Sequence, residues 1–180
     1  MTATTTRPPQ PAALLGLWHG LLDLVFPPRC VGCQRPGVWF CPDCLAKVQP
    51  IPPPICRICG DRVFGSDLCD SCRQTPPVID GIRSVSLHQG HLRKAIHGFK
   101  YGRQRDLAPI LASLLAGCLI LNPLPADLMA PVPLHPNRQR QRGYNQSALL
   151  ARALAEALPH AQQAVNLYSY RADYKADGWV

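Results

Sequence analysis

The stretch CVGCQRPGVWFCPDC, residues 30–44, decides the fold of the N-terminal part of this chain. It holds two Cys-x-x-Cys knuckles with seven residues between them, and the related stretch CRICGDRVFGSDLCDSC, residues 56–72, holds two more. A knuckle places two thiolates on one side of a tight turn, and two knuckles complete a tetrahedron around Zn²⁺. The eight expected zinc ligands are Cys30, Cys33, Cys41, Cys44, Cys56, Cys59, Cys69 and Cys72.

Zinc is the metal that this ligand set predicts. Four thiolates without a histidine leave no open position for a reacting water, so the one or two zinc ions are expected to be structural. Disulfides or an iron-sulfur cluster are the alternative uses of such cysteines. Sequential pairing gives one site in each stretch, and interleaved pairing is also compatible with the spacing. The short internal loops favour sequential pairing, and Gly32 and Gly60 are expected to help the turns form.

The N-terminal residues indicate in which cellular compartment the protein is expected. Residues 1–11 are rich in Pro and Thr and predict a disordered leader, and residues 12–28 predict a short amphipathic helix that stops at its two final prolines. The apolar stretch lacks a small-x-small cleavage site and is too short to span a membrane. We therefore expect a cytoplasmic protein, and a reducing cytoplasm favours metal binding over disulfides.

Composition divides the chain near residue 75. Eight of the nine cysteines lie in residues 29–75, the predicted double zinc ribbon, where apolar runs are too few for a conventional core and metal must replace it. Zn²⁺ held by four thiolates carries about −2, so two sites would lower the formal charge from +8 to about +4. The anion-binding potential therefore belongs to the second half, whose basic residues include Arg93, Lys94, Lys100, Arg103, Arg105, Arg138, Arg140 and Arg142.

Residues 76–160 alternate between extended and helical patterns. The expected elements are strands at residues 82–87 and 127–134, helices at 91–99, 106–120 and 145–158, and an arginine-rich loop at 135–143. The order strand, polar loop, helix is typical of an α/β nucleotide or phosphate site.

The second motif is PVPLHPNRQRQRGYNQ, residues 131–146. Three arginines at alternate positions precede a glycine at the start of the last expected helix, so guanidinium groups and helix N-terminal amides could meet on one polyanion. Pyrophosphate suits that geometry. A phosphate contact with nucleic acid, or a solvated basic loop without a ligand, would account for the same residues.

In this order, the knuckles and the arginine motif resemble the ComF family, bacterial double-zinc-ribbon proteins with a type I phosphoribosyltransferase domain that are associated with DNA uptake. The likeness covers about residues 14–158 and includes FPPRC at 26–30, HLRKAIHGFKY at 91–101, PVPL at 131–134 and RGYNQ at 142–146. It implies a small four-cysteine zinc-ribbon module followed by an incomplete α/β phosphoribosyltransferase-like domain at residues 76–160.

The resemblance also implies ligands and partners. The arginine-rich segment would lie on the pyrophosphate of phosphoribosyl pyrophosphate (PRPP), and Mg²⁺ is expected only with bound PRPP. Family members are thought to handle single-stranded DNA, and competence or DNA-repair proteins are the expected protein partners. The anion-binding residues carried over are Arg138, Arg142, Gly143, Tyr144, Asn145, Gln146 and Lys100.

One departure from the family pattern concerns catalysis. Such enzymes hold the ribose hydroxyls with an acidic pair and the 5′-phosphate with a Thr-Thr-Gly loop after a later strand. This sequence has no two adjacent acidic residues, and residues 161–180 form a divergent tail, as a truncation or a frameshift would produce. We therefore expect a phosphoribosyltransferase-family protein that is catalytically incomplete, with no catalytic residue assigned.

The alternative is a zinc-ribbon adaptor that binds nucleic acid or protein partners. The basic loop and two aromatic side chains, Trp39 and Tyr144, favour nucleic acid because partly exposed aromatic rings can stack on bases. The aspartates of the ribbon half argue against a ribbon-based contact with phosphates. A steep salt dependence of DNA binding would distinguish this function from that of a small-ligand site.

Overall fold

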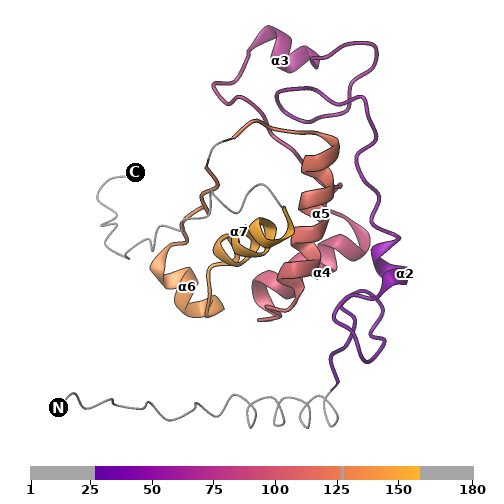
Figure 1. Cartoon of the computed structure of the whole chain (residues 1–180), viewed down its shortest axis with the longest axis vertical. Helices are drawn as coiled ribbons and strands as arrows, with labels where there is room; N and C mark the ends of the chain where they lie inside the picture. Colours follow the sequence, from indigo (N-terminus) through magenta and orange to yellow (C-terminus); the bar gives the residue numbers. More distant parts are fainter. Residues whose placement is uncertain (1–26, 127, 159–180) are drawn as a thin grey trace, which may run out of the picture.

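The computed structural model describes residues 27–126 and 128–158 (Figure 1). The predicted leader at residues 1–11, nearly all of the predicted helix at 12–28 and the predicted tail at 161–180 lie outside these ranges. The helices of the described chain are α2 (Pro42–Leu45), α3 (Asp70–Gln74), α4 (Gly90–Tyr101), α5 (Leu107–Leu121), α6 (Pro136–Arg142) and α7 (Gln146–Ala157). Among them, none is long and apolar enough to cross a membrane.

Three long helices confirm the helices predicted from the spacing of apolar residues. The helix predicted at 91–99 is α4, which buries Leu92, Ala95 and Phe99 along one face. The helices predicted at 106–120 and 145–158 are α5 and α7, which pack against each other (Figure 1). Pro109 lies in the first turn of α5, where its missing N–H costs no hydrogen bond. Apolar side chains three and four residues apart therefore predicted these elements closely.

The two predicted strands are wrong for the described residues. Residues 82–87 contribute a single isolated bridge, between Ser86 and Pro50, and residues 128–134 belong to no β-bridge. A strand is stable only when a neighbour accepts and donates its backbone hydrogen bonds, and the two prolines in 128–134 lack the N–H group altogether. The described residues thus form no sheet, and the α/β part of the predicted fold stays a prediction.

The arginine-rich segment is a helix and not the predicted loop. Pro136 occupies the first turn of α6, and Nδ1 of His135 accepts a hydrogen bond from the amide of Asn137 at 3.2 Å. The helix ends at Gly143, whose φ of +78° is the left-handed conformation of a helix C-terminus and whose amide donates to the Gln139 carbonyl. None of its residues is buried, so no apolar periodicity marked it in the sequence.

The main core combines the first ribbon with the long helices. Buried side chains of the ribbon, among them Cys30, Phe40 and Cys44, share one apolar cluster with Phe99 of α4 and Leu107 of α5. The second ribbon has a separate small cluster made only of residues 56–72. In Figure 1, α2 of the first ribbon lies beside α4, whereas α3 of the second ribbon lies at the far end of the molecule. The predicted boundary at residue 75 is therefore crossed by the main core.

Candidate functional site

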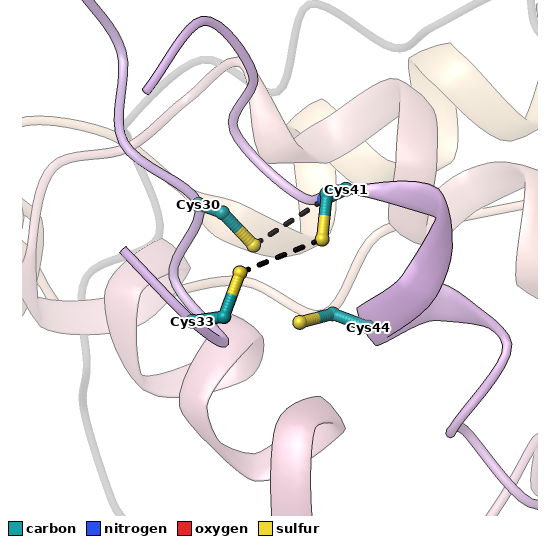
Figure 2. Close-up of side chains that lie close together, drawn as sticks. All are labelled: Cys30, Cys33, Cys41 and Cys44. Carbon is teal, nitrogen blue, oxygen red and sulfur yellow. Dashed lines mark hydrogen bonds between the residues drawn. The ribbon is translucent and has the colours of Figure 1, made fainter. Parts of the chain in front are cut away.

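The first cysteine set converges on one point (Figure 2). The Sγ atoms of Cys30, Cys33, Cys41 and Cys44 all lie within 4.8 Å of one another, and those of Cys33 and Cys41 are 3.6 Å apart. The backbone amide of Cys41 donates a hydrogen bond of 3.3 Å to the Cys30 sulfur. In a tetrahedron with Zn–S bonds of about 2.3 Å, neighbouring sulfurs are about 3.8 Å apart. The donor set and its spacing therefore fit Zn²⁺.

The second set repeats this geometry. The Sγ atoms of Cys56, Cys59, Cys69 and Cys72 also lie within 4.8 Å of one another, with 3.6 Å between Cys59 and Cys69. The amide of Cys72 donates to the Cys69 sulfur at 3.4 Å. The eight cysteines thus pair sequentially, and the interleaved arrangement does not occur. Both sites are complete four-thiolate sets, as expected of structural zinc.

The two ribbons share the same turn after their first knuckle. The amides of Gln34 and Gly60 donate to the carbonyls of Cys30 and Cys56, at 2.7 and 3.0 Å. Both residues have positive φ, +66° at Gln34 and +76° at Gly60. Gly60 therefore helps the turn to form, as predicted, because glycine adopts positive φ without strain. In the first ribbon the equivalent position is Gln34, not Gly32.

Gly32 has a different function. A Cβ atom at this position would lie 2.6 Å from the Cys44 sulfur and 2.7 Å from the His91 ring. Its backbone is therefore in close contact with both the metal site and α4. The Lys94 ammonium of α4 donates to the Gly32 carbonyl at 3.1 Å, which further fixes the first site against the helix.

The thiols of each set differ in acidity. Burial opposes ionisation of Cys30, but the backbone amides of Cys41, Cys33 and Gly32 outweigh it and lower the pKa of the Cys30 thiol to about 6. Burial and the neighbouring thiols raise the pKa of Cys44 to about 12. The second set has the same asymmetry, because amides lower the pKa of Cys56 to about 6 despite burial. Four adjacent thiolates therefore require the charge of a divalent cation, which zinc would supply when bound.

The arginine helix α6 carries the residues expected to bind an anion. Arg138 and Arg140 are exposed, and the Arg140 guanidinium donates to the Asn137 side chain. The guanidinium of Arg142 donates to Oε1 of Gln146 at 2.9 Å. The Gln146 side chain is buried, and its Nε2 has no hydrogen-bond acceptor in the described part of the chain.

The amides at the start of α7 are already bonded. Oδ1 of Asn145 accepts from the amides of Ser147 and Ala148, at 3.0 and 3.4 Å. An anion beside this segment would therefore contact side chains and not these two amides, which corrects the expected role of the helix N-terminus. Asn145 also donates to the Val132 carbonyl at 3.3 Å and so ties the helix to the preceding extended segment.

Tyr144 is a buried structural residue and not a partly exposed stacking residue as predicted. Its side chain is 7% exposed, and its hydroxyl donates to the backbone carbonyl of Phe99 in α4. Burial raises the pKa of the phenol, although Arg105 and Arg142 act in the opposite direction. Trp39, the other aromatic residue predicted to stack on bases, is partly exposed and packs against the main core.

Arg105 is one of the basic residues of the second half, but its contact with this site was not predicted from the sequence. Its guanidinium donates to the Gly143 carbonyl at 2.8 Å and lies 4.8 Å from the centre of the Tyr144 ring. It therefore holds the turn between α6 and α7. Lys100 is exposed in the last turn of α4. It lies between Phe99, which binds Tyr144, and Tyr101, whose ring lies 5.0 Å from the Arg142 guanidinium carbon.

Known proteins match this chain over both halves. Residues 21–78 match the family of double zinc ribbon domains. The DNA utilization protein YhgH of Salmonella typhi is 32% identical over 160 residues, which cover 83% of this chain and 70% of that protein. YhgH of Escherichia coli K12 is 30% identical over 152 residues, 77% of this chain and 65% of its own length.

A more distant relative is the competence protein ComFC of Bacillus subtilis, 23% identical over 139 residues, 73% of this chain and 58% of that protein. The chain spans about two thirds of the length of these relatives. No solved structure has significant similarity to it. The double zinc ribbon, together with a relative that is 32% identical over most of both chains, shows that this chain belongs to the ComF family.

Proposed function

We propose that this protein takes part in the uptake or use of DNA and that its arginine helix binds the pyrophosphate group of PRPP. Relatives named for DNA utilization and for competence support the first part. The second part rests on α6 and the turn that follows it. Tyr144 fixes this turn on α4 and Arg105 fixes it on the segment between α4 and α5, while Arg138 stays exposed with no ion pair in the described chain.

The observation that carries the proposal is the pairing of Arg142 with Gln146. The Arg142 guanidinium uses the Gln146 oxygen, which leaves the buried Gln146 Nε2 without an acceptor among the described residues. An unsatisfied buried donor costs about 1–3 kcal/mol. A phosphate oxygen would satisfy this donor once the side chains that cover Nε2 moved aside, and the guanidinium groups of α6 would neutralise its charge. Mg²⁺ would accompany PRPP.

We propose binding without turnover for this chain. None of its eleven acidic residues has an acidic neighbour in the sequence, so no adjacent pair is available to hold the ribose hydroxyls. The proposed site therefore recognises the pyrophosphate end of the ligand, and the zinc ribbons have a structural role.

Calorimetric titration of PRPP and Mg²⁺ into the zinc-loaded 180-residue protein tests this proposal. We expect binding that Arg138→Ala weakens about 10- to 100-fold, since a charged hydrogen bond contributes about 1.5–3 kcal/mol. Arg152→Ala is the control, because Arg152 is an exposed arginine on α7, outside the proposed site. Equal affinity in all three proteins would contradict the anion site, and measurable PRPP turnover would contradict binding without catalysis.

A second function is favoured by one specific observation. Tyr101 is 61% exposed, and its ring lies close to both the Arg142 guanidinium and the His97 ring. Alternation of cationic and aromatic side chains is typical of surfaces that bind single-stranded nucleic acid. Binding through several phosphates would weaken steeply as salt rises, whereas pyrophosphate binding at one site would depend on Arg138.

A further inference from the structure

The two cysteine sets differ in how far solvent reaches their members. In the first set Cys33 is exposed, and the three other cysteines are buried. In the second set no cysteine is exposed, since two are buried and two are half-buried. The susceptibility of a cysteine to oxidants follows its exposure as well as its thiolate character. Of the eight zinc ligands, Cys33 is therefore the one that an oxidant in solution can approach most easily.

A second thiol lies next to Cys33. The sulfur of Cys41 comes from the other knuckle of the first site and lies 3.6 Å from the Cys33 sulfur (Figure 2). The sulfurs of a disulfide are about 2.05 Å apart, so these two need to approach by only about 1.5 Å. Cys41 is 1% exposed. It is therefore shielded from an oxidant in solution but well placed to react with an oxidised Cys33.

The rest of the first site is held in place more firmly than Cys33. The Cys30 sulfur accepts a hydrogen bond from the Cys41 amide, and both Cys30 and Cys44 belong to the main core. In contrast, residues 33–38 are exposed throughout. A shift of the Cys33 side chain toward Cys41 therefore displaces surface residues and not the core.

We propose that Cys33 is an oxidation site, at which hydrogen peroxide converts Cys33 and Cys41 to a disulfide and so removes two ligands from the first zinc site. The Cys33 sulfur attacks one peroxide oxygen and the O–O bond breaks, which leaves a sulfenic acid on Cys33 and a hydroxide that takes a proton from solvent. The Cys41 thiolate then attacks the Cys33 sulfur, so that the S–S bond forms and the S–O bond breaks. The second hydroxide is also protonated. Two thiolates thus lose two electrons, and hydrogen peroxide is reduced to two molecules of water.

Oxidation of the first site would also affect the helices. Two thiolates would remain, whereas structural zinc takes four protein ligands. The carbonyl of Gly32, the neighbour of Cys33, accepts a hydrogen bond from Lys94 of α4, and Phe99 of α4 shares the main core with the buried cysteines. The Phe99 carbonyl in turn accepts the hydrogen bond of Tyr144. Loss of zinc should therefore loosen α4 and the turn after the arginine helix, whatever ligand that helix binds.

The second site is a matched control. The sulfurs of Cys59 and Cys69 are also 3.6 Å apart and come from different knuckles, but both residues are only half-buried. The two sites therefore differ in access and not in the spacing of these sulfurs. Cys118 is the remaining cysteine, and Cys118→Ser leaves the zinc ligands as the only thiols of the chain.

The test is oxidation of the zinc-loaded full chain carrying Cys118→Ser by about one equivalent of hydrogen peroxide, the amount that one disulfide consumes. A chromophoric chelator measures the released zinc, and mass spectrometry of alkylated peptides identifies the disulfide. We expect one zinc ion to be released ahead of the other, with a disulfide between Cys33 and Cys41 as the product. Added Cys59→Ser should keep the fast release, because the first site is intact, and added Cys33→Ser should abolish it.

Hydrogen exchange of the α4 amides should become faster in the oxidised protein, and a dithiol with added zinc should reverse the change. Simultaneous release of both zinc ions, earlier release from the second site, or a first-site disulfide other than that of Cys33 with Cys41 would overturn the inference. Unchanged exchange in α4 would overturn the link to the helices. The result does not depend on the folding of Cys33→Ser, because the Cys118→Ser protein alone shows which site is oxidised first.

Discussion

Gln34 and Gly60 have the same place in their ribbons and nearly the same backbone conformation, with φ of +66° and +76°. The left-handed conformation costs a residue with a side chain about 1–2 kcal/mol, and glycine avoids this cost. A Cβ on Gly60 would also lie 2.7 Å from the Ile82 carbonyl oxygen. The two ribbons therefore form the same turn with different residues, and only the second uses the residue that the turn favours.

We expect opposite effects from exchanging these residue types. Gly60→Ala should weaken zinc binding at the second site about tenfold or more. The backbone strain of an alanine at positive φ and its close contact with the Ile82 carbonyl would both destabilise the turn. Gln34→Gly should strengthen zinc binding at the first site by at most about 1 kcal/mol. Glycine removes the backbone strain at positive φ, but the greater conformational entropy that it has in the unfolded chain offsets part of this gain. Competition with a chromophoric chelator measures both. A gain in zinc affinity from Gly60→Ala would contradict the shared-turn interpretation.

The turn between α6 and α7 depends on a residue outside both helices. Arg105 bonds to the Gly143 carbonyl and lies over the Tyr144 ring, so Arg105→Ala should destabilise this turn by about 1–2 kcal/mol. Hydrogen exchange of the α6 amides should then become about tenfold faster. Arg105→Lys should have an intermediate effect, because an ammonium keeps the charge but lacks the planar fork. Unchanged exchange in Arg105→Ala would show that Tyr144 alone holds the turn.

These elements also show what sequence patterns can and cannot predict. The zinc ligands were predictable because a knuckle is a local motif, and α4, α5 and α7 were predictable because each buries apolar side chains at helical spacing. The helix α6 buries nothing, so it left no periodic signal. Strand patterns were misleading because alternation does not reveal whether a neighbouring strand exists. The role of Arg105 was not predicted because its partner Gly143 is 38 positions away.

At the scale of the molecule, the two zinc sites have unequal importance. The first shares its core with α4, α5 and Tyr144, and through them it supports the arginine helix. Among the described residues, the second has only its own small cluster. The second ribbon is joined to the rest by backbone contacts such as the Ile82 amide with the Ile58 carbonyl at 2.6 Å, and by Arg83, which donates to the carbonyls of Arg57 and Asn122.

Removing a ligand from each site in turn should therefore have different consequences. Cys44→Ser deprives the first site of a buried ligand, and we expect it to lower the thermal midpoint of helix loss by circular dichroism, since a structural zinc site contributes directly to folding. Cys72→Ser makes the matched change in the second site and should leave the helical midpoint close to that of the unaltered protein. Both variants should bind one zinc ion fewer. Equal losses of helix stability would show that the second ribbon also supports the helical core.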